Sequence, residues 1–319
     1  MDSPELYHVK QQFTLGAYKS LVDLTLPGPD SPEYTPTLVY QARAHLALDK
    51  PSAVLTLVPS DTENVALKAV AALAKYISAE DEPAKEAERD AALEELRDLC
   101  VEIEGDDAEA TEWEKGTVRV LAGTAFARAG EVEEALETLG AGTDARNLEA
   151  VAYTVQIYLS IHRPDLARKE FERAKRWAED DLLLQHIEAA IGLATGRDAY
   201  ADAHAFFTEQ LANPSLTSPR LLTARGVARL LRGELGAAKS DLEEAQAQMG
   251  GTPDAETLGA QTVAAGLGTA KTAEAEQLFS RLEKEHPGFP LVLDLERKAA
   301  LFDELAAKFV VPPLATASA

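Results

Sequence analysis

A short recurring pattern constrains the fold of this chain more than any other feature of its sequence. Each copy has a turn residue, an apolar residue two positions later, a small residue three positions after that, and then a leucine-rich run. The turn residues are Gly16, Gly130, His162 and Gly233 in the clear copies and Asp49, Asp198 and Ala270 in the weaker ones. The small or apolar markers are Leu21, Val54, Ala135, Ala167, Ala203, Ala238 and Ala275, with one more expected near Ala92. The mean spacing is about 36 residues, which indicates a repeat architecture.

A period near 34 residues with two helices per unit is typical of the tetratricopeptide repeat. The turn residue ends the first helix, and the small residue allows the two helices to approach closely where they cross. One helix pair cannot cover its own apolar face, so the units must stack. The sequence therefore predicts an all-α, tetratricopeptide-like α-solenoid of about eight helix pairs, with a C-terminal capping helix over 291–309.

The repeat runs along most of the chain, so we expect one domain. The solenoid is predicted to cover residues 1–310, with an irregular acidic insertion near 79–116 and a flexible tail over 311–319. Helix breakers separate the units. Asp61, Ser218 and Thr252 are predicted helix N-caps, with Pro219 and Pro253 at the first helical position.

The charge balance excludes several classes of function. Asp and Glu number 54 against 31 Lys and Arg, so the formal net charge is −23. Because such a chain repels phosphate backbones, we expect no nucleic-acid partner. One cysteine, Cys100, leaves no internal disulfide, and the N-terminus has no signal-peptide pattern, so the cytosol is the expected compartment. No long apolar run is present, so any membrane contact is expected to be peripheral.

The residues that would carry catalysis do not form a recognisable set. None of the six histidines lies in a zinc-protease pattern, and no serine nucleophile motif is present. The paired carboxylates are expected on solvated helix faces. The sequence therefore predicts no catalytic residue, no cofactor and no metal.

The concave wall of a repeat solenoid is its usual binding surface. Counting back from each small marker predicts fifteen inward positions on the first helices, of which only Glu188 is charged. A wall of small and apolar residues suits a dry contact with another protein. A register error of one or two positions would make them helix-packing residues instead. The predicted partner-binding residues are Val120, Thr124, Ala152, Gln156, Leu159, Thr223, Val227, Leu230, Ala260 and Ala264, and the remaining inward positions are Ala127, Glu188, Gly192, Thr195 and Leu267.

The sequence carries a family likeness over nearly its whole length, which is densest at 150–197. The run at 154–180 and the Leu-Ala-Thr-Gly at 193–196 resemble the epsilon subunit family of coatomer, the COPI vesicle coat. Both chain ends, 5–22 and 286–310, are also similar to the ends of that family, and the likeness is weak over 60–125. The matching residues are Val155, Gln156, Ile157, Arg163, Asp165, Leu166, Ala167, Arg168, Lys169, Glu170, Leu193, Ala194, Thr195 and Gly196.

This resemblance implies a scaffold subunit and not an enzyme. It implies binding to the C-terminal domain of coatomer's alpha subunit, with the repeats curled around an extended element of that domain. Other coatomer subunits would be contacted indirectly. It also implies a cytoplasmic protein that is peripheral on Golgi membranes and COPI-coated vesicles and acts in Golgi-to-ER retrograde transport.

Two other functions remain open from the sequence. A chaperone-type adaptor for peptide tails would need a basic clamp on the first helices, where Arg119, Arg225 and Arg229 are available. We expect these arginines to pair with nearby acids instead. The second alternative, an enzyme with a helical lid, is not supported by any catalytic constellation in the sequence.

Overall fold

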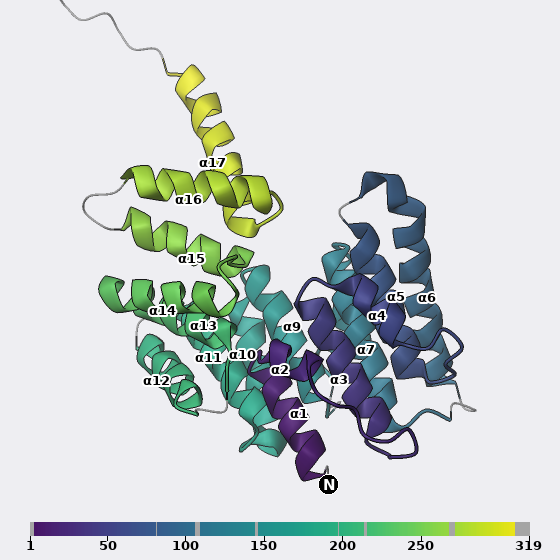
Figure 1. Ribbon diagram of the computed structural model, residues 1–319. Helices are drawn as coiled ribbons and strands as arrows, with labels where there is room; N and C mark the ends of the chain where they lie inside the picture. The colour runs from purple at the N-terminus through teal and green to yellow at the C-terminus, as the bar shows by residue number, and fades with distance from the viewer. Residues whose placement is uncertain are drawn as a thin grey trace, which may run out of the picture.

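The computed structural model describes residues 3–80, 82–105, 109–143, 146–196, 198–213, 216–267 and 272–309. All regular elements within these ranges are helices: seventeen α-helices, arranged as eight antiparallel pairs followed by α17, and one 3-10 turn (Figure 1). The predicted all-α solenoid of about eight pairs with a further C-terminal helix is confirmed.

The helices are α1 (Pro4–Thr14), α2 (Tyr18–Val22), α3 (Tyr34–Ala47), α4 (Pro51–Leu57), α5 (Val65–Glu80), the 3-10 turn η1 (Pro83–Lys85), α6 (Glu86–Glu104), α7 (Glu112–Arg128), α8 (Val132–Thr138), α9 (Leu148–Ser160), α10 (Pro164–Ala178), α11 (Leu182–Thr195), α12 (Ala199–Leu211), α13 (Pro219–Leu231), α14 (Leu235–Gln248), α15 (Ala255–Gly266), α16 (Thr272–Glu285) and α17 (Pro290–Ala307).

Five of the seven predicted turn residues share one backbone conformation. Gly16, Gly130 and Gly233 have φ of 74°, 84° and 80°, and Asp49 and His162 have φ of 56° and 58°. This left-handed conformation ends the first helix of these five pairs and redirects the chain into the second. Glycine adopts it without steric cost, which is why glycine is the commonest residue in this slot. Asp198 differs, with a right-handed φ of −63°, and Ala270 lies outside the described residues.

The small markers lie at the crossings that the pattern predicts. They fall on the second helices of the pairs, and those from α2 to α14 are almost wholly buried. Ala92, the marker missing from the regular series, lies on α6 and is 2% exposed. Ala275 on α16 is half-buried. The buried markers are Leu21, Val54, Ala92, Ala135, Ala167, Ala203 and Ala238.

One of the three predicted N-caps is confirmed. Ser218 precedes α13, its hydroxyl accepts a hydrogen bond from the Leu221 amide at 3.2 Å, and Pro219 is the first helical residue. The serine oxygen accepts a hydrogen bond from a backbone amide that has no partner within the helix. Proline at the first helical position has no amide hydrogen, so one fewer donor is left unpaired.

The other two N-cap predictions are wrong by a few residues. α5 is capped by Asn64 and not by Asp61, and α15 is capped by Asp254 and not by Thr252, so Pro253 lies outside the helix. In both cases the capping side chain directly precedes the first buried turn. Tertiary packing fixes where that turn begins, and several polar residues in the loop have side chains that can act as an N-cap.

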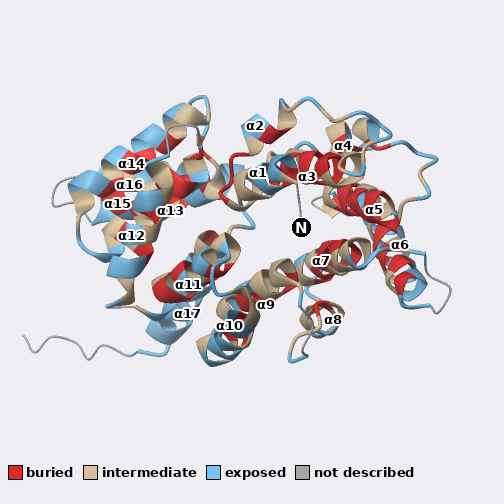
Figure 2. Cartoon of the chain, turned by 90° about the horizontal axis from the view of Figure 1, so that it is seen from below, coloured by how far each residue is buried: buried red, intermediate tan, exposed pale blue. Residues whose placement is uncertain are grey.

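The stack curves until its beginning meets its seventh pair, and the first helices of the pairs line the inside of the resulting ring (Figure 2). Lys19 Nζ donates to the Gln248 carbonyl on α14 at 2.6 Å, and Ser218 Oγ donates to the Leu15 carbonyl at 2.5 Å. Leu15 packs into a core with Phe207 and Leu221. We call the inner face of the ring, formed by the odd-numbered helices α1 to α13, the hollow side.

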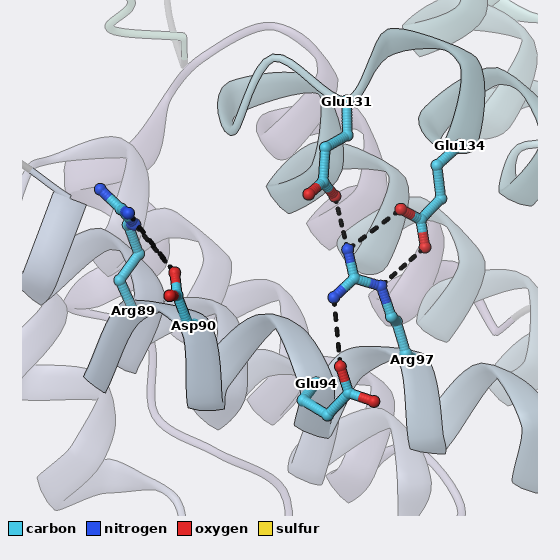
Figure 3. Close-up of polar contacts among 6 residues, drawn as sticks. All are labelled: Arg89, Asp90, Glu94, Arg97, Glu131 and Glu134. Atoms are coloured by element: carbon cyan, nitrogen blue, oxygen red, sulfur yellow. Dashed lines mark hydrogen bonds and ion pairs between the residues drawn. The ribbon is translucent and has the colours of Figure 1, made fainter. Parts of the chain in front are cut away.

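Charged residues on the outer face connect neighbouring pairs. In the acidic stretch 79–116, α6 contributes Arg97, whose guanidinium contacts three glutamates (Figure 3). Its nitrogens lie 2.7 Å from Glu131, 2.8 Å from Glu134 and 3.2 Å from Glu94. The hydrogen bond from Arg97 is the main cause that lowers the pKa of Glu134. This cluster holds the third pair against the fourth.

The last helix continues beyond the ring (Figure 1). Val292 in the first turn of α17 is fully buried and packs with Leu258 and Leu282. The helix therefore covers the end of the eighth pair by its first turn. The predicted tail over 311–319 lies outside the described residues.

Candidate partner-binding surface

A part-buried ion pair joins two helices across the hollow side. Arg43 on α3 lies 2.7 Å from Glu149 on α9, and Tyr40 Oη donates to the same carboxylate at 2.6 Å. α5 and α7 separate these helices along the stack, so they can meet only across its concave face. Sequence analysis missed this contact, because its members are more than a hundred residues apart. It shows how tightly the stack curves from the second pair to the fifth.

The electrostatics of this contact favour the charged pair. Burial works against both charges, but Glu149 raises the pKa of Arg43, and Arg43 lowers the pKa of Glu149. The Arg43 guanidinium also lies 4.5 Å from the ring centre of Phe13 on α1. A cation over an aromatic face is favourable, and more so when desolvated. Through Arg43, the first pair is held against both α3 and α9.

The arginines that could form a peptide clamp are paired with acids, as the sequence analysis expected. Arg225 and Arg229 on α13 each lie 2.7 Å from Asp241 on α14, which is 4% exposed. Arg119 faces Glu104 at 3.9 Å. The two α13 arginines neutralise one buried carboxylate, so they are not available to bind an incoming one.

The ten predicted partner-binding residues fall into three groups by exposure. Val120, Thr223, Ala260 and Ala264 are buried between helices, and Thr223 bonds to Thr257 on α15 at 2.7 Å between hydroxyls. Gln156 is exposed. The half-buried residues are Thr124, Ala152, Leu159, Val227 and Leu230. The partner-binding role of all ten remains a prediction. The exposed and half-buried residues have side-chain surface available for a contact.

On α11 the predicted inward register is shifted. A side chain at Gly192 would place its Cβ 3.2 Å from the Ala199 carbonyl, so this position faces the partner helix α12. Glu188, Gly192 and Thr195 line a groove of about 510 Å³ with residues of α10 and α12. Asp198, the turn residue before α12, has φ −63° and lacks the left-handed conformation of Gly130 and Gly233, which moves the helical positions relative to the marker Ala203.

The reactive side chains of the described ranges do not assemble into a site. No group of three or more His, Cys, Asp or Glu residues there could hold a metal ion. Burial lowers the pKa of His186, which packs edge-on to Phe206 and Phe207. Burial raises the pKa of Cys100 to about 11, which keeps it a thiol. Among the described helices, none has the length and apolarity needed to cross a bilayer.

Comparison with known proteins decides the family. The sequence profile of the coatomer epsilon subunit matches residues 2–310. The chain belongs to the coatomer epsilon subunit family. Family membership makes it a component of the COPI coat, a multi-subunit complex of vesicle-mediated transport.

Relatives in distant eukaryotes are similar over most of their length. Coatomer subunit epsilon-1 of Arabidopsis thaliana is 26% identical, covering 90% of this chain and 91% of the relative. Coatomer subunit epsilon of Caenorhabditis elegans is 25% identical, covering 95% and 97%. The probable coatomer subunit epsilon of Schizosaccharomyces pombe is 27% identical, covering 73% and 71%.

Solved structures support the fold alone. A tetratricopeptide repeat protein from Parabacteroides merdae has a TM-score of 0.52 at 13% identity and covers 81% of this chain and 95% of its own. The APC/C hetero-tetramer Cut9–Hcn1 has a TM-score of 0.57 at 14% identity and covers 92% of this chain and 53% of its own. Both matches agree with a tetratricopeptide-like solenoid.

Proposed function

We propose that this coatomer epsilon family member is a non-enzymatic scaffold that surrounds an extended element of the C-terminal domain of the coat's alpha subunit. It contributes no catalysis and stabilises the assembled coat. Other coatomer subunits are contacted indirectly. The protein is cytoplasmic, attaches to Golgi membranes and COPI-coated vesicles only through the coat, and serves Golgi-to-ER retrograde transport.

The observation that carries this proposal is the closure of the ring. The first pair meets α13 and α14 through the Leu15–Ser218 and Lys19–Gln248 contacts, so the hollow side is enclosed on most of its circumference. An enclosed wall contacts an inserted element from several directions at once. Such a geometry fits a permanent subunit contact better than brief capture of a peptide end.

The charges of the first helices support a dry contact. Arg43 is paired with Glu149, and Arg225 and Arg229 share the one carboxylate of Asp241. An adaptor for peptide tails would instead keep such cations free for a terminal carboxylate. The scaffold contact should therefore be insensitive to salt, whereas binding through free cations would weaken steeply with it.

The test is binding of the full chain to the recombinant C-terminal domain of the alpha subunit, measured by calorimetry at low and high salt. Gln156→Arg and Leu230→Arg each add a charge that must be desolvated in the contact, and each should weaken binding at least tenfold. Ser240→Arg on the outer helix α14 adds the same charge away from the hollow side and should bind like wild type.

The exposed Gln156 keeps the test decisive if Leu230→Arg disturbs packing, because Leu230 is partly buried in a small core. Helical circular dichroism should be unchanged for Gln156→Arg. Wild-type affinity in Gln156→Arg and in a folded Leu230→Arg would contradict the hollow-side contact. Binding that disappears at high salt would favour the adaptor instead.

A further inference from the structure

The outer helix α10 carries an unusual concentration of positive charge for so acidic a protein. It holds Arg168, Lys169, Arg173, Lys175 and Arg176, against three acids. The whole chain has 31 basic residues against 54 acidic ones. α10 lies on the outer side of the ring, away from the hollow side (Figure 2).

Most of these cations have no counter-charge. Within the described ranges, no carboxylate lies within ion-pair distance of Lys169 or Arg176, and Arg168 makes only a 3.5 Å hydrogen bond to Thr195. Only Arg173 is paired, with Glu170 at 3.1 Å. On α6, by contrast, one arginine is surrounded by three glutamates (Figure 3). Unpaired cations on a chain of this charge point to an external anion.

These side chains line a single groove of about 660 Å³ that follows the outward face of α10 and ends at Thr195. Two acids also line it. Asp165 is already paired with Arg163 at 2.8 Å, which leaves Glu172 as the one uncompensated acid. The groove therefore keeps an excess of positive charge from Arg168, Lys169 and Arg176.

The spacing of the cations sets the shape of the ligand. Arg168 or Lys169, Arg173 and Arg176 follow one another at intervals of three to five residues, which separates them by ~4.5–7.5 Å along the axis. Acidic residues at alternate positions of an extended peptide are separated by ~6.6 Å on one side. The groove from Asp165 to Arg176 is ~16 Å long and accommodates about five extended residues.

We propose that the outward face of α10 is a docking site for a short, extended, acidic peptide segment of another polypeptide. Arginine binds carboxylates with two parallel hydrogen bonds, and clusters of arginine are a recurring means of recognising acidic motifs. This site differs from a tetratricopeptide clamp, because it lies on a second helix and outside the ring. It does not depend on the hollow-side contact.

An acidic peptide fits this surface better than an anionic membrane does. At physiological salt the field of a charge extends only ~8 Å, so a peptide within the groove is affected mainly by the nearby cations. A flat bilayer would also approach Glu179, Asp180 and Asp181, which follow α10 and are exposed. The overall charge of −23 would oppose it further.

The test uses the full chain and a fluorescein-labelled pentapeptide of alternating glutamate and serine, followed by fluorescence anisotropy. The wild-type protein should bind this peptide and not the matched glutamine–serine peptide. Arg168→Glu with Arg176→Glu should weaken binding at least tenfold. Lys239→Glu with Lys284→Glu changes the net charge equally on α14 and α16, and should bind within twofold of wild type.

A second measurement does not depend on the variants folding. A peptide with a photo-reactive group in place of its central serine should cross-link to the 163–176 segment of the wild-type chain. Equal losses in the two double variants, cross-links elsewhere, or no peptide binding would overturn the proposal. Phosphatidylserine vesicles that bind through Arg168 and Arg176 while the peptide does not would also overturn it.

Discussion

The two ends of the chain are both amphipathic helices, but the apolar face is buried at the N-terminus and largely exposed at the C-terminus. At the N-terminus, Leu6 and Val9 pack against Leu21 and Tyr40, and Leu15 enters the core of the sixth and seventh pairs. At the C-terminus, α17 buries only Val292. Its later apolar residues are exposed, Leu301 by 53%, Phe302 by 71% and Leu305 by 55%, and so is Phe309 just after the helix, by 79%.

Position relative to the curve, and not composition, explains this difference. The curvature of the stack returns the first pair to α13 and α14, so its apolar faces find partners on two sides. α17 follows the eighth pair, beyond the point where the ring closes, and among the described residues its first turn packs against α15 and α16 of that pair (Figure 1). An apolar helix face is buried only where the tertiary path brings another surface to it.

The sharpest way to break this comparison is to truncate one apolar side chain at each end. Leu15→Ala should lower the free energy of unfolding by about 3 kcal/mol, because it leaves a cavity in a closed core. Phe302→Ala, on the exposed part of α17, should change it by less than about 0.5 kcal/mol. Urea denaturation measures both. Similar losses would show that the ends are equally packed.

A second comparison uses one carboxylate from each region. Glu149→Gln leaves Arg43 without its counter-charge across the hollow side, and should cost about 2 kcal/mol, a figure reduced because Glu149 is part-exposed. Asp294→Asn on α17, whose partners Arg297 and Lys298 are solvated, should leave unfolding unchanged.

The Glu149 effect should also depend on pH. Because the folded protein lowers the pKa of Glu149 from 4.5, the ion pair stabilises the fold above about pH 4.5 and is lost as the pH falls through the lowered value. The stability difference between wild type and Glu149→Gln should therefore shrink on acidification. A difference that stays constant down to pH 2 would contradict the part-buried pair.

The smallest expected effect distinguishes the closing turn from an ordinary turn of the stack. Gly130→Ala forces alanine into a left-handed conformation in open space and should cost about 1 kcal/mol. Gly16→Ala adds contacts at 3.2 Å and 3.3 Å to Arg220 and Ser218, so it should cost about 1 kcal/mol more. Equal melting temperatures in the two variants would place Arg220 and Ser218 farther from this turn.

Local features were predictable because they depend on a few neighbouring residues. The turn at His162 and the buried crossing at Ala167 both follow from the short repeat pattern, and the pairing of Arg225 and Arg229 with an acid follows from the excess of acidic residues. Which polar residue capped a helix was less predictable. Asn64 and Asp254 are the N-caps because the packing of the first helical turn begins directly after them.

The candidate binding surface was predictable only in part. Counting positions identified the exposed Gln156, but it also selected Thr223 and Ala264, which pack between first helices. On α11 the register itself is shifted, because Gly192 faces the partner helix α12 and not the hollow side. The cations of α10 were visible in the sequence, but their lack of partners was not.

The sequence by itself indicated a stack of about eight helix pairs, because most pairs carry a recurring turn residue and small residue. Its run at 154–180 and its Leu-Ala-Thr-Gly at 193–196 indicated the coatomer epsilon family. The tertiary structure alone decided that the stack closes, that Arg43 meets Glu149, and that α17 remains uncovered. The path of the stack is the sum of many small rotations between neighbouring pairs. No local pattern contains that sum, so the contacts that depend on it emerge only when the whole chain is folded.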